Sequence, residues 1–277
     1  MAVLKATPSG YFLWDYIPSR PAAICFAALF FAGTVAISWQ SIRTRTKFAI
    51  PFIIGGMFEV GGYAARAASQ DMTDQLAPYI AQYMLILVAP GLFAASVYMI
   101  LGRVILSVQG EAHSPVAPRG LTRTFVWGDV LSFLTQVAGG SLQSMKKVDP
   151  KIGERVVLGG LVLQILVFAG FAAVALVWHR RMRREPTAAS ASAAGRWESV
   201  MLMLYGVGSL VMVRCVFRVL EYGMGRDAYL LRNEWTMFVF DSALMVVAVG
   251  VFAWWYPGRL PEPKKGIYEQ MEGGGEV

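Results

Sequence analysis

Charged residues are scarce in this chain. Asp, Glu, Lys and Arg make up 16% of its 277 residues, whereas a typical soluble domain contains about 25%. Hydrophobic residues make up 56%. This composition argues against a soluble globular fold, and it predicts an all-α bundle of membrane-spanning helices, in which every backbone polar group is satisfied inside its own helix.

Residues that carry redox, metal or nucleotide chemistry are also few. The two cysteines, Cys25 and Cys215, stand singly in apolar stretches, where packing is the expected role. The two histidines, His113 and His179, fall in predicted loops, and no His-Glu-x-x-His pair occurs. A Gly-x-x-x-x-Gly-Lys-Ser/Thr phosphate loop is absent as well. We therefore expect no enzyme activity, no metal and no cofactor.

Seven stretches of about 20 mostly apolar residues are long enough to cross a bilayer. They lie near residues 21–40, 47–67, 78–102, 124–143, 155–178, 197–222 and 233–256. The sequence thus predicts one seven-transmembrane domain over residues 21–257, whose first span is also the targeting signal. Residues 1–20 form the expected extracellular N-terminal segment, and residues 258–277, rich in Gly, Pro, Glu and Lys, form an expected disordered cytoplasmic tail.

The basic residues are sorted by loop. The first, third and fifth connections and the C-terminal tail hold fourteen, against eight in the N-terminal segment and the other connections. The positive-inside rule then predicts an outside N-terminus and a cytoplasmic C-terminus. Topology and attraction to anionic lipid at the cytoplasmic face explain the net charge of +7, so nucleic acid is not required. The Arg-rich and Ala/Ser-rich loop 179–196 is expected to be a flexible linker.

Polar residues inside four of the spans recur at an interval of seven. Seven residues are close to two helical turns, so each pair lies on one face of its helix. A charge in hydrocarbon costs at least about 2.5 kcal/mol, so we expect these faces to line a shared polar cavity. The pairs are Glu59 and Arg66, Asp129 and Gln136, Arg214 and Glu221, and Glu234 and Asp241.

Two further residues share these faces, Tyr63 in the second span and Arg218 in the sixth. These faces together hold five acids and three bases. This excess of acid suits a cationic amine headgroup, with the arginines keeping carboxylates ionised or binding phosphate. The alternative for each helix is a structural ion pair. The candidate site comprises Glu59, Tyr63, Arg66, Asp129, Gln136, Arg214, Arg218, Glu221, Glu234 and Asp241.

Several short motifs follow one another along the chain and together resemble the fungal lipid-translocating exporters of the RTA-like family, which includes sphingoid long-chain-base exporters. The resemblance covers roughly residues 12–258. Phe238 departs from it, since a tyrosine is usual there, and Tyr256-Pro257 stands where His-Pro is common. The motifs are Tyr16-Ile-Pro-Ser19, Glu59 with Gly62-Tyr63 and Arg66, Ala89-Pro90, Asp129 with Gln136 and Gly139-Gly140, Arg214 with Phe217-Arg218 and Glu221, and Glu234 with Phe238 and Asp241.

The resemblance implies a multi-pass protein of the plasma membrane that exports a sphingoid base or similar amphiphile and confers resistance to toxic amphiphiles. Two alternatives stay open on the residues themselves. One is a seven-span receptor or sensor that binds a lipid and signals through its basic cytoplasmic loops. The other is a structural protein whose charged faces only join helices. Glu59 and Asp241, the deepest carboxyls, are the expected titrating groups of a transporter.

Overall fold

The computed structural model describes residues 18–143, 149–192, 196–224 and 233–258. Over these residues it contains helices and connecting turns and no strand, which confirms the all-α class. The expectations for the N-terminal segment and the C-terminal tail concern residues 1–17 and 259–277, which lie outside the described residues.

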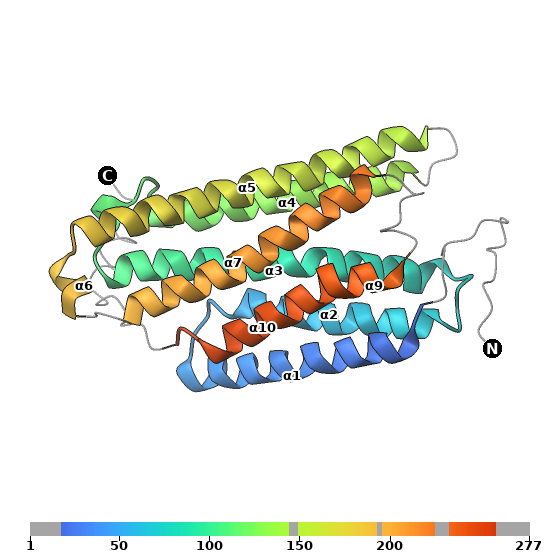
Figure 1. Ribbon diagram of the computed structural model, residues 1–277, viewed down its shortest axis with the longest axis horizontal. Helices are drawn as coiled ribbons and strands as arrows, with labels where there is room; N and C mark the ends of the chain where they lie inside the picture. The colour runs from blue at the N-terminus through green and yellow to red at the C-terminus, as the bar shows by residue number, and fades with distance from the viewer. Residues whose placement is uncertain (1–17, 144–148, 193–195, 225–232, 259–277) are drawn as a thin grey trace, which may run out of the picture.

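Seven long helical stretches run up and down along the long axis of an elongated bundle (Figure 1). Each contains most of one predicted span. A 3-10 turn, η1 (Glu111–His113), and a short helix, α6 (Ala188–Ser192), lie in the connections. The long stretches are α1 (Arg20–Thr44), α2 (Ile50–Ser69), α3 (Leu76–Ser107), α4 (Pro118–Gln143), α5 (Pro150–Arg184), α7 (Arg196–Gly223) and the continuous run of α9 (Glu234–Met237), the π-helix η2 (Phe238–Ala243) and α10 (Leu244–Trp254).

Five of these stretches are long and apolar enough to cross a membrane: α1, α3, α5, α7 and the run from α9 to α10. The protein is therefore a membrane protein. The two other long helices, α2 and α4, are those that carry Glu59 with Arg66 and Asp129 with Gln136.

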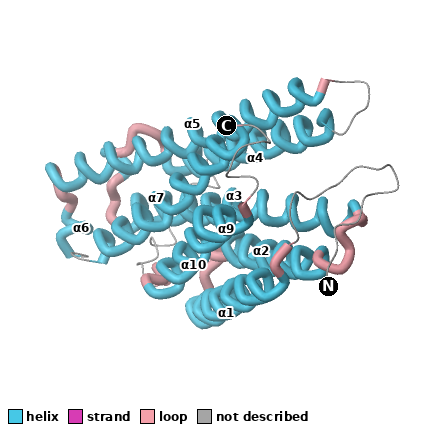
Figure 2. Tube along the Cα trace, turned by 45° about the vertical axis from the view of Figure 1, so that its right-hand side comes forward, coloured by secondary structure: helices cyan, strands magenta, loops and turns pink. Residues whose placement is uncertain are grey.

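The helices are arranged around α3 and α7. An antiparallel hairpin of α4 and α5 covers one side, and α1, α2 and α10 cover the other (Figures 1 and 2). In the most apolar stretch of α3, 67% of the residues are buried inside the protein, whereas 22% are buried in the corresponding stretch of α1. The central position of α3 explains why residues from both sides of the bundle contact it.

Contacts between aromatic rings join the two sides of the bundle to α3. Phe52 of α2 lies between Phe93 of α3 and Phe252 of α10, with ring centroids 4.3 and 4.0 Å away. Across the bundle, Tyr98 of α3 lies 4.4 Å from Phe171 of α5. Aromatic pairs of this kind contribute about 0.5–1.5 kcal/mol beyond the area they bury.

The loop 179–196 differs from its prediction. Helix α5 continues to Arg184, so His179 lies in a helix, and α6 forms within the Ala/Ser run. Thr187 fixes this turn, because its hydroxyl donates to the carbonyl of Val108 at 2.6 Å and accepts from the backbone N–H of Ser190 at 3.1 Å. A threonine at the start of an Ala-rich run is a favourable helix beginning. The linker prediction was wrong for residues 179–184 and 188–192, which are helical, and residues 193–195 are not described.

A glycine of α4 allows α5 to approach backbone to backbone. A Cβ added at Gly139 would lie 2.6 Å from the backbone nitrogen of Val157 and 2.9 Å from the carbonyl oxygen of Gly153. An added Cβ at the next residue, Gly140, meets nothing within 4 Å. Small residues at such crossings are typical of membrane helix pairs.

Gly139→Ala should therefore lower stability by about 1–3 kcal/mol, because the backbone of α5 has to move away. Gly140→Ala is the matched control, and we expect it to be neutral or slightly stabilising because alanine favours helix. Thermal unfolding of both variants in detergent micelles checks this. Equal midpoints for the two variants would contradict the close approach of α4 and α5.

Candidate functional site

Polar side chains from four helices meet inside the half of the bundle where α2 ends and α9 begins. Most of them are buried, although the surrounding helices are apolar. The sequence places them there because each lies on the one polar face of its helix, and these faces avoid lipid by facing each other. We call this set the buried polar cluster: Glu59, Tyr63, Arg66, Gln82, Tyr83, Arg214, Arg218, Glu221, Glu234, Asp241 and Ser242.

Asp241 is the centre of the ion pairs in this cluster. It is fully buried in η2, and its two carboxylate oxygens contact Arg214 and Arg218 of α7. Arg218 also contacts Glu221, one turn further along α7, at 3.0 Å. One carboxylate thus neutralises part of two guanidinium groups, and Glu221 completes the compensation.

A proline in α3 leaves a backbone carbonyl without its helical donor, and this carbonyl is a further acceptor for Arg214. Pro90 has no backbone N–H, so the carbonyl of Ile86, four residues earlier, lacks its usual helical donor. The guanidinium of Arg214 donates to this carbonyl at 3.0 Å. The carbonyl that the proline leaves unpaired thus gains a donor, and the buried guanidinium gains an acceptor.

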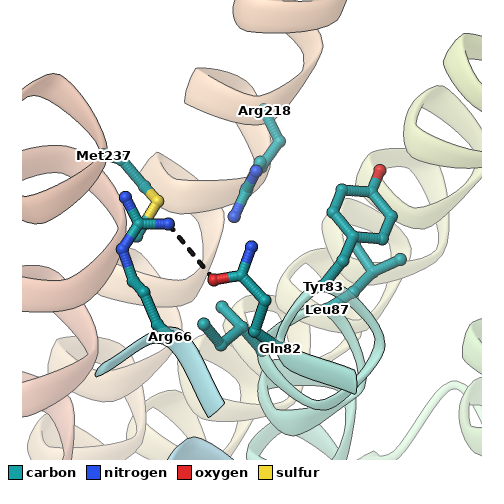
Figure 3. A pocket seen from close by; sticks show the side chains of 7 residues that line it. Arg66, Gln82, Tyr83, Leu87, Arg218 and Met237 are labelled. Carbon is teal, nitrogen blue, oxygen red and sulfur yellow. Dashed lines mark hydrogen bonds between the residues drawn. The ribbon is translucent and has the colours of Figure 1, made fainter. Parts of the chain in front are cut away.

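Arg66 and Glu234 join the ends of three helices. The Nη2 atom of Arg66 lies 2.7 Å from Glu234, and its Nη1 atom donates to Gln82 at 3.3 Å (Figure 3). Both carboxylate oxygens of Glu234 accept the backbone N–H of Ser19, at 3.0 and 3.1 Å. Glu234 thereby attaches the beginning of α1 to the end of α2 and closes the cluster at this end of the bundle.

Glu59 differs from the other carboxyls of the cluster. Its side chain is 1% exposed, and neither carboxyl oxygen has a hydrogen-bond partner among the described residues. The neighbouring charges are those of Arg214, Asp241 and Arg218, which already pair with each other. The cluster holds three guanidinium groups and four carboxyls, so it contains one carboxyl in excess.

An aromatic wall covers the cluster on the side of α1. Tyr63 hydrogen-bonds to Ser242 and stacks on Phe30, at a centroid distance of 5.5 Å. Phe238 stacks on Phe26 at 5.2 Å and lies 5.4 Å from the guanidinium carbon of Arg66. The ring of Phe238, which stands where the family resemblance leads one to expect a tyrosine, therefore has a packing and cation–π role that needs no hydroxyl.

The space left between these side chains is small. A pocket of about 50 Å³ opens between α2, α3, α7 and α9 (Figure 3). It has room for a few waters, each of which needs about 10–15 Å³, but not for a lipid headgroup. The polar side chains pack mainly against each other, so the cluster is closed in this conformation. The lining residues are Arg66, Gln82, Tyr83, Ile86, Leu87, Arg218 and Met237.

Two predicted residues, both on α4, have partners outside the cluster. Asp129 accepts a hydrogen bond from Tyr98 of α3 at 2.9 Å. Gln136 donates to Gln164 of α5 at 3.1 Å. The structure therefore divides the predicted site, bringing eight of its residues together and leaving these two in a separate polar row.

The sequence interpretation missed residues of α3 and of the π-helix. Gln82 lies in the cluster, and Tyr83 hydrogen-bonds to Tyr222 of α7. Ser242 follows Asp241 in η2, and both are buried. π-helical turns are frequent at functional sites. A lone glutamine within the apolar stretch 78–102 was the available signal for α3. Nothing in the sequence signalled the π-helix.

Comparisons with known proteins fit these observations. Residues 52–263 match the family model described as RTA1 like protein. Protoporphyrin uptake protein 1 of Saccharomyces cerevisiae is 30% identical, over 90% of this chain and 93% of that protein. Protein RTA1 of the same yeast is 31% identical, over 90% and 86%. Sphingoid long-chain base transporter RSB1 of Saccharomyces cerevisiae is 23% identical, over 79% and 66%. No solved structure matches the chain.

Proposed function

We propose that this chain, which belongs to the RTA1-like protein family, binds a cationic amphiphile such as a sphingoid long-chain base and moves it across a membrane. The headgroup binds in an opened form of the buried polar cluster, since the closed form leaves a pocket of only about 50 Å³, and the hydrocarbon tail lies between helices. In a cell this activity would export toxic amphiphiles from the plasma membrane and so confer resistance to them. A relative named as a sphingoid long-chain base transporter supports transport over a receptor or a purely structural role.

The excess carboxyl of Glu59 is the observation that carries this proposal. A buried ionised carboxylate without a partner is strongly unfavourable. An ammonium group supplies both the missing charge and up to three N–H donors. Because the arginines of the cluster are already compensated, a cationic headgroup next to Glu59 balances the charge of the whole cluster.

The names of the relatives point to different cargoes, so the charge of the cluster has to decide between them. One relative is named for protoporphyrin uptake and another for sphingoid base transport. Protoporphyrin carries carboxylates, which supply no positive charge to balance Glu59. An ammonium group supplies that charge and so allows Glu59 to be ionised. The charge balance therefore favours a long-chain amine as the cargo of this chain.

The membrane topology belongs to the proposal as well. Helices α2 and α4 complete seven spans, with their polar faces turned inward. The ends of α1, α3 and α5 and the beginnings of α4 and α7 meet at one end of the bundle (Figure 1), which we call the basic end. In the proposed orientation, this end is cytoplasmic. It holds Arg43, Arg45, Lys47, Arg103, Arg123, Arg180, Arg181, Arg183, Arg184 and Arg196.

Flux through vesicles that contain only the purified protein tests the proposed function. We expect a fluorescent sphingoid base to cross these vesicles faster than protein-free vesicles, and a fluorescent phospholipid to show a smaller increase. Saturable binding of the base without flux would instead identify a receptor. If the protein neither binds the base nor moves it, the ion pairs are only structural contacts between helices.

A further inference from the structure

A second pocket lies at the basic end, between the last turns of α5 and the first turns of α7. Its volume is about 380 Å³, which is within the usual range for small-molecule sites. None of its residues belongs to the buried polar cluster. We call it the α5–α7 cleft, and it is lined by His179, Arg183, Glu198, Ser199, Leu202 and Tyr205.

One wall of the cleft is held in place by aromatic contacts. The Nδ1 atom of His179 lies 2.9 Å from the hydroxyl of Tyr205, and the two rings stack at 5.7 Å. Trp197 meets the His179 ring edge-on at 5.5 Å. The other ring nitrogen, Nε2, is buried and has no hydrogen-bond partner in the part of the chain that the structure describes. A fixed wall with an unused polar atom is suited to a polar ligand.

The surroundings of the cleft are positive, while its own lining holds one arginine and one carboxylate. Glu198 contacts Arg183 at the Nε atom, at 3.4 Å, so the guanidinium can use its two terminal nitrogens for another acceptor. The side chains of Arg180, Arg184 and Arg196 are exposed at the same end of the bundle. Guanidinium groups bind phosphate oxygens through two parallel hydrogen bonds. A phosphate is therefore suited to Arg183, and the exposed arginines nearby add attraction for an anion.

One edge of the cleft is apolar. Leu202, which lines the cleft one turn beyond Glu198, is 67% exposed. Leu176 lies on α5 one turn before His179 and is 43% exposed. Both belong to helices that are long and apolar enough to cross a membrane, so these side chains face lipid. A free anion makes no favourable contact with such an apolar edge. The acyl chains attached to a phospholipid headgroup pack against it.

We propose that the α5–α7 cleft binds the phosphate of an anionic phospholipid, with its acyl chains along Leu176 and Leu202. This site is separate from the cargo site at Glu59, and it does not depend on the identity of the cargo. The phosphate contacts Arg183 and the His179 side of the cleft. The bound lipid joins α5 to α7 at the membrane surface and stabilises the bundle there.

Thermal unfolding of the full-length protein in micelles of a neutral detergent tests this site. Titration with phosphatidic acid should raise the unfolding temperature in a saturable way, because a ligand of the folded state stabilises it. Phosphatidylcholine should raise it less. Arg183→Gln should weaken the apparent affinity for phosphatidic acid at least about tenfold, as expected for losing a charged hydrogen bond. Arg183 is largely exposed, so the lipid-free variant should unfold like the wild type.

Arg43→Gln is the matched control, because it removes the same charge from the basic end at an exposed residue of α1. We expect it to leave the affinity for phosphatidic acid unchanged. An equal loss of affinity in both variants would mean diffuse attraction to the basic end and would overturn the proposal. So would an equal stabilisation by inorganic phosphate or glycerol 3-phosphate, which would assign the cleft to a soluble anion.

Discussion

Glu59→Gln should lower the flux of a long-chain amine at least about tenfold, while the protein stays folded. Glutamine keeps the shape of the side chain but removes the negative charge that we assign to ammonium binding, and a charged hydrogen bond is worth about 1.5–3 kcal/mol. Because the carboxyl has no hydrogen-bond partner among the described residues, its replacement removes no observed hydrogen bond. The unfolding temperature should therefore stay the same or rise. Flux in vesicles and thermal unfolding in micelles measure the two effects.

Asp129→Asn is the matched control for Glu59→Gln. It makes the same change from carboxyl to amide at a buried residue, but Asp129 contacts Tyr98 and lies in the separate row on α4. We expect it to retain most of the flux. Equal loss of flux in both variants would show that a buried carboxyl is needed for another reason, and full flux in Glu59→Gln would exclude Glu59 from cargo binding.

Asp241→Asn should have the opposite profile, with a loss of stability of about 3–5 kcal/mol. This carboxylate pairs with Arg214 and Arg218 inside the bundle, so its removal leaves two buried positive charges with too little compensation. The sequence interpretation treats Glu59 and Asp241 alike, as titrating groups. From its ion pairs with Arg214 and Arg218 we expect a structural role for Asp241, and a loss of flux in this variant would then report a loss of folded protein. Thermal unfolding of the variant measures the effect.

A double-mutant cycle isolates this role. Arg218→Gln added to Asp241→Asn removes one of the uncompensated charges, and we expect it to restore part of the lost stability. Losses that simply add would mean that the two residues do not interact in the folded protein. The buried ion pairs described here would then be wrong.

The fold class and the position of most helices follow from the sequence, because a bilayer leaves the backbone few options. Apolar stretches of about 20 residues predict helices directly. The seven-residue interval predicts that Glu59 shares a face with Arg66, and the structure brings both to the same cluster. The interval gives no information on which helix lies opposite that face. Asp129 was therefore expected in the same cavity, although its partner is Tyr98 of α3.

Other features depend on contacts that a single sequence does not show. The carbonyl of Ile86 becomes an acceptor only because Pro90 lies four residues later and Arg214 lies opposite. The assignment of Glu59 as the excess carboxyl depends on how each arginine is paired. The expected shared polar cavity is reduced to a pocket of about 50 Å³, because paired side chains fill the space between the helices.

The affinity of the wild-type protein in nanodiscs for a long-chain amine and for its N-acetylated analogue is the most direct measurement of the central claim. Both ligands have the same tail, and only the amine carries the charge that complements Glu59. Our account predicts that the amine binds at least about tenfold more tightly, which is the effect of one charged hydrogen bond. Equal affinities would contradict recognition of a cationic headgroup by the buried polar cluster.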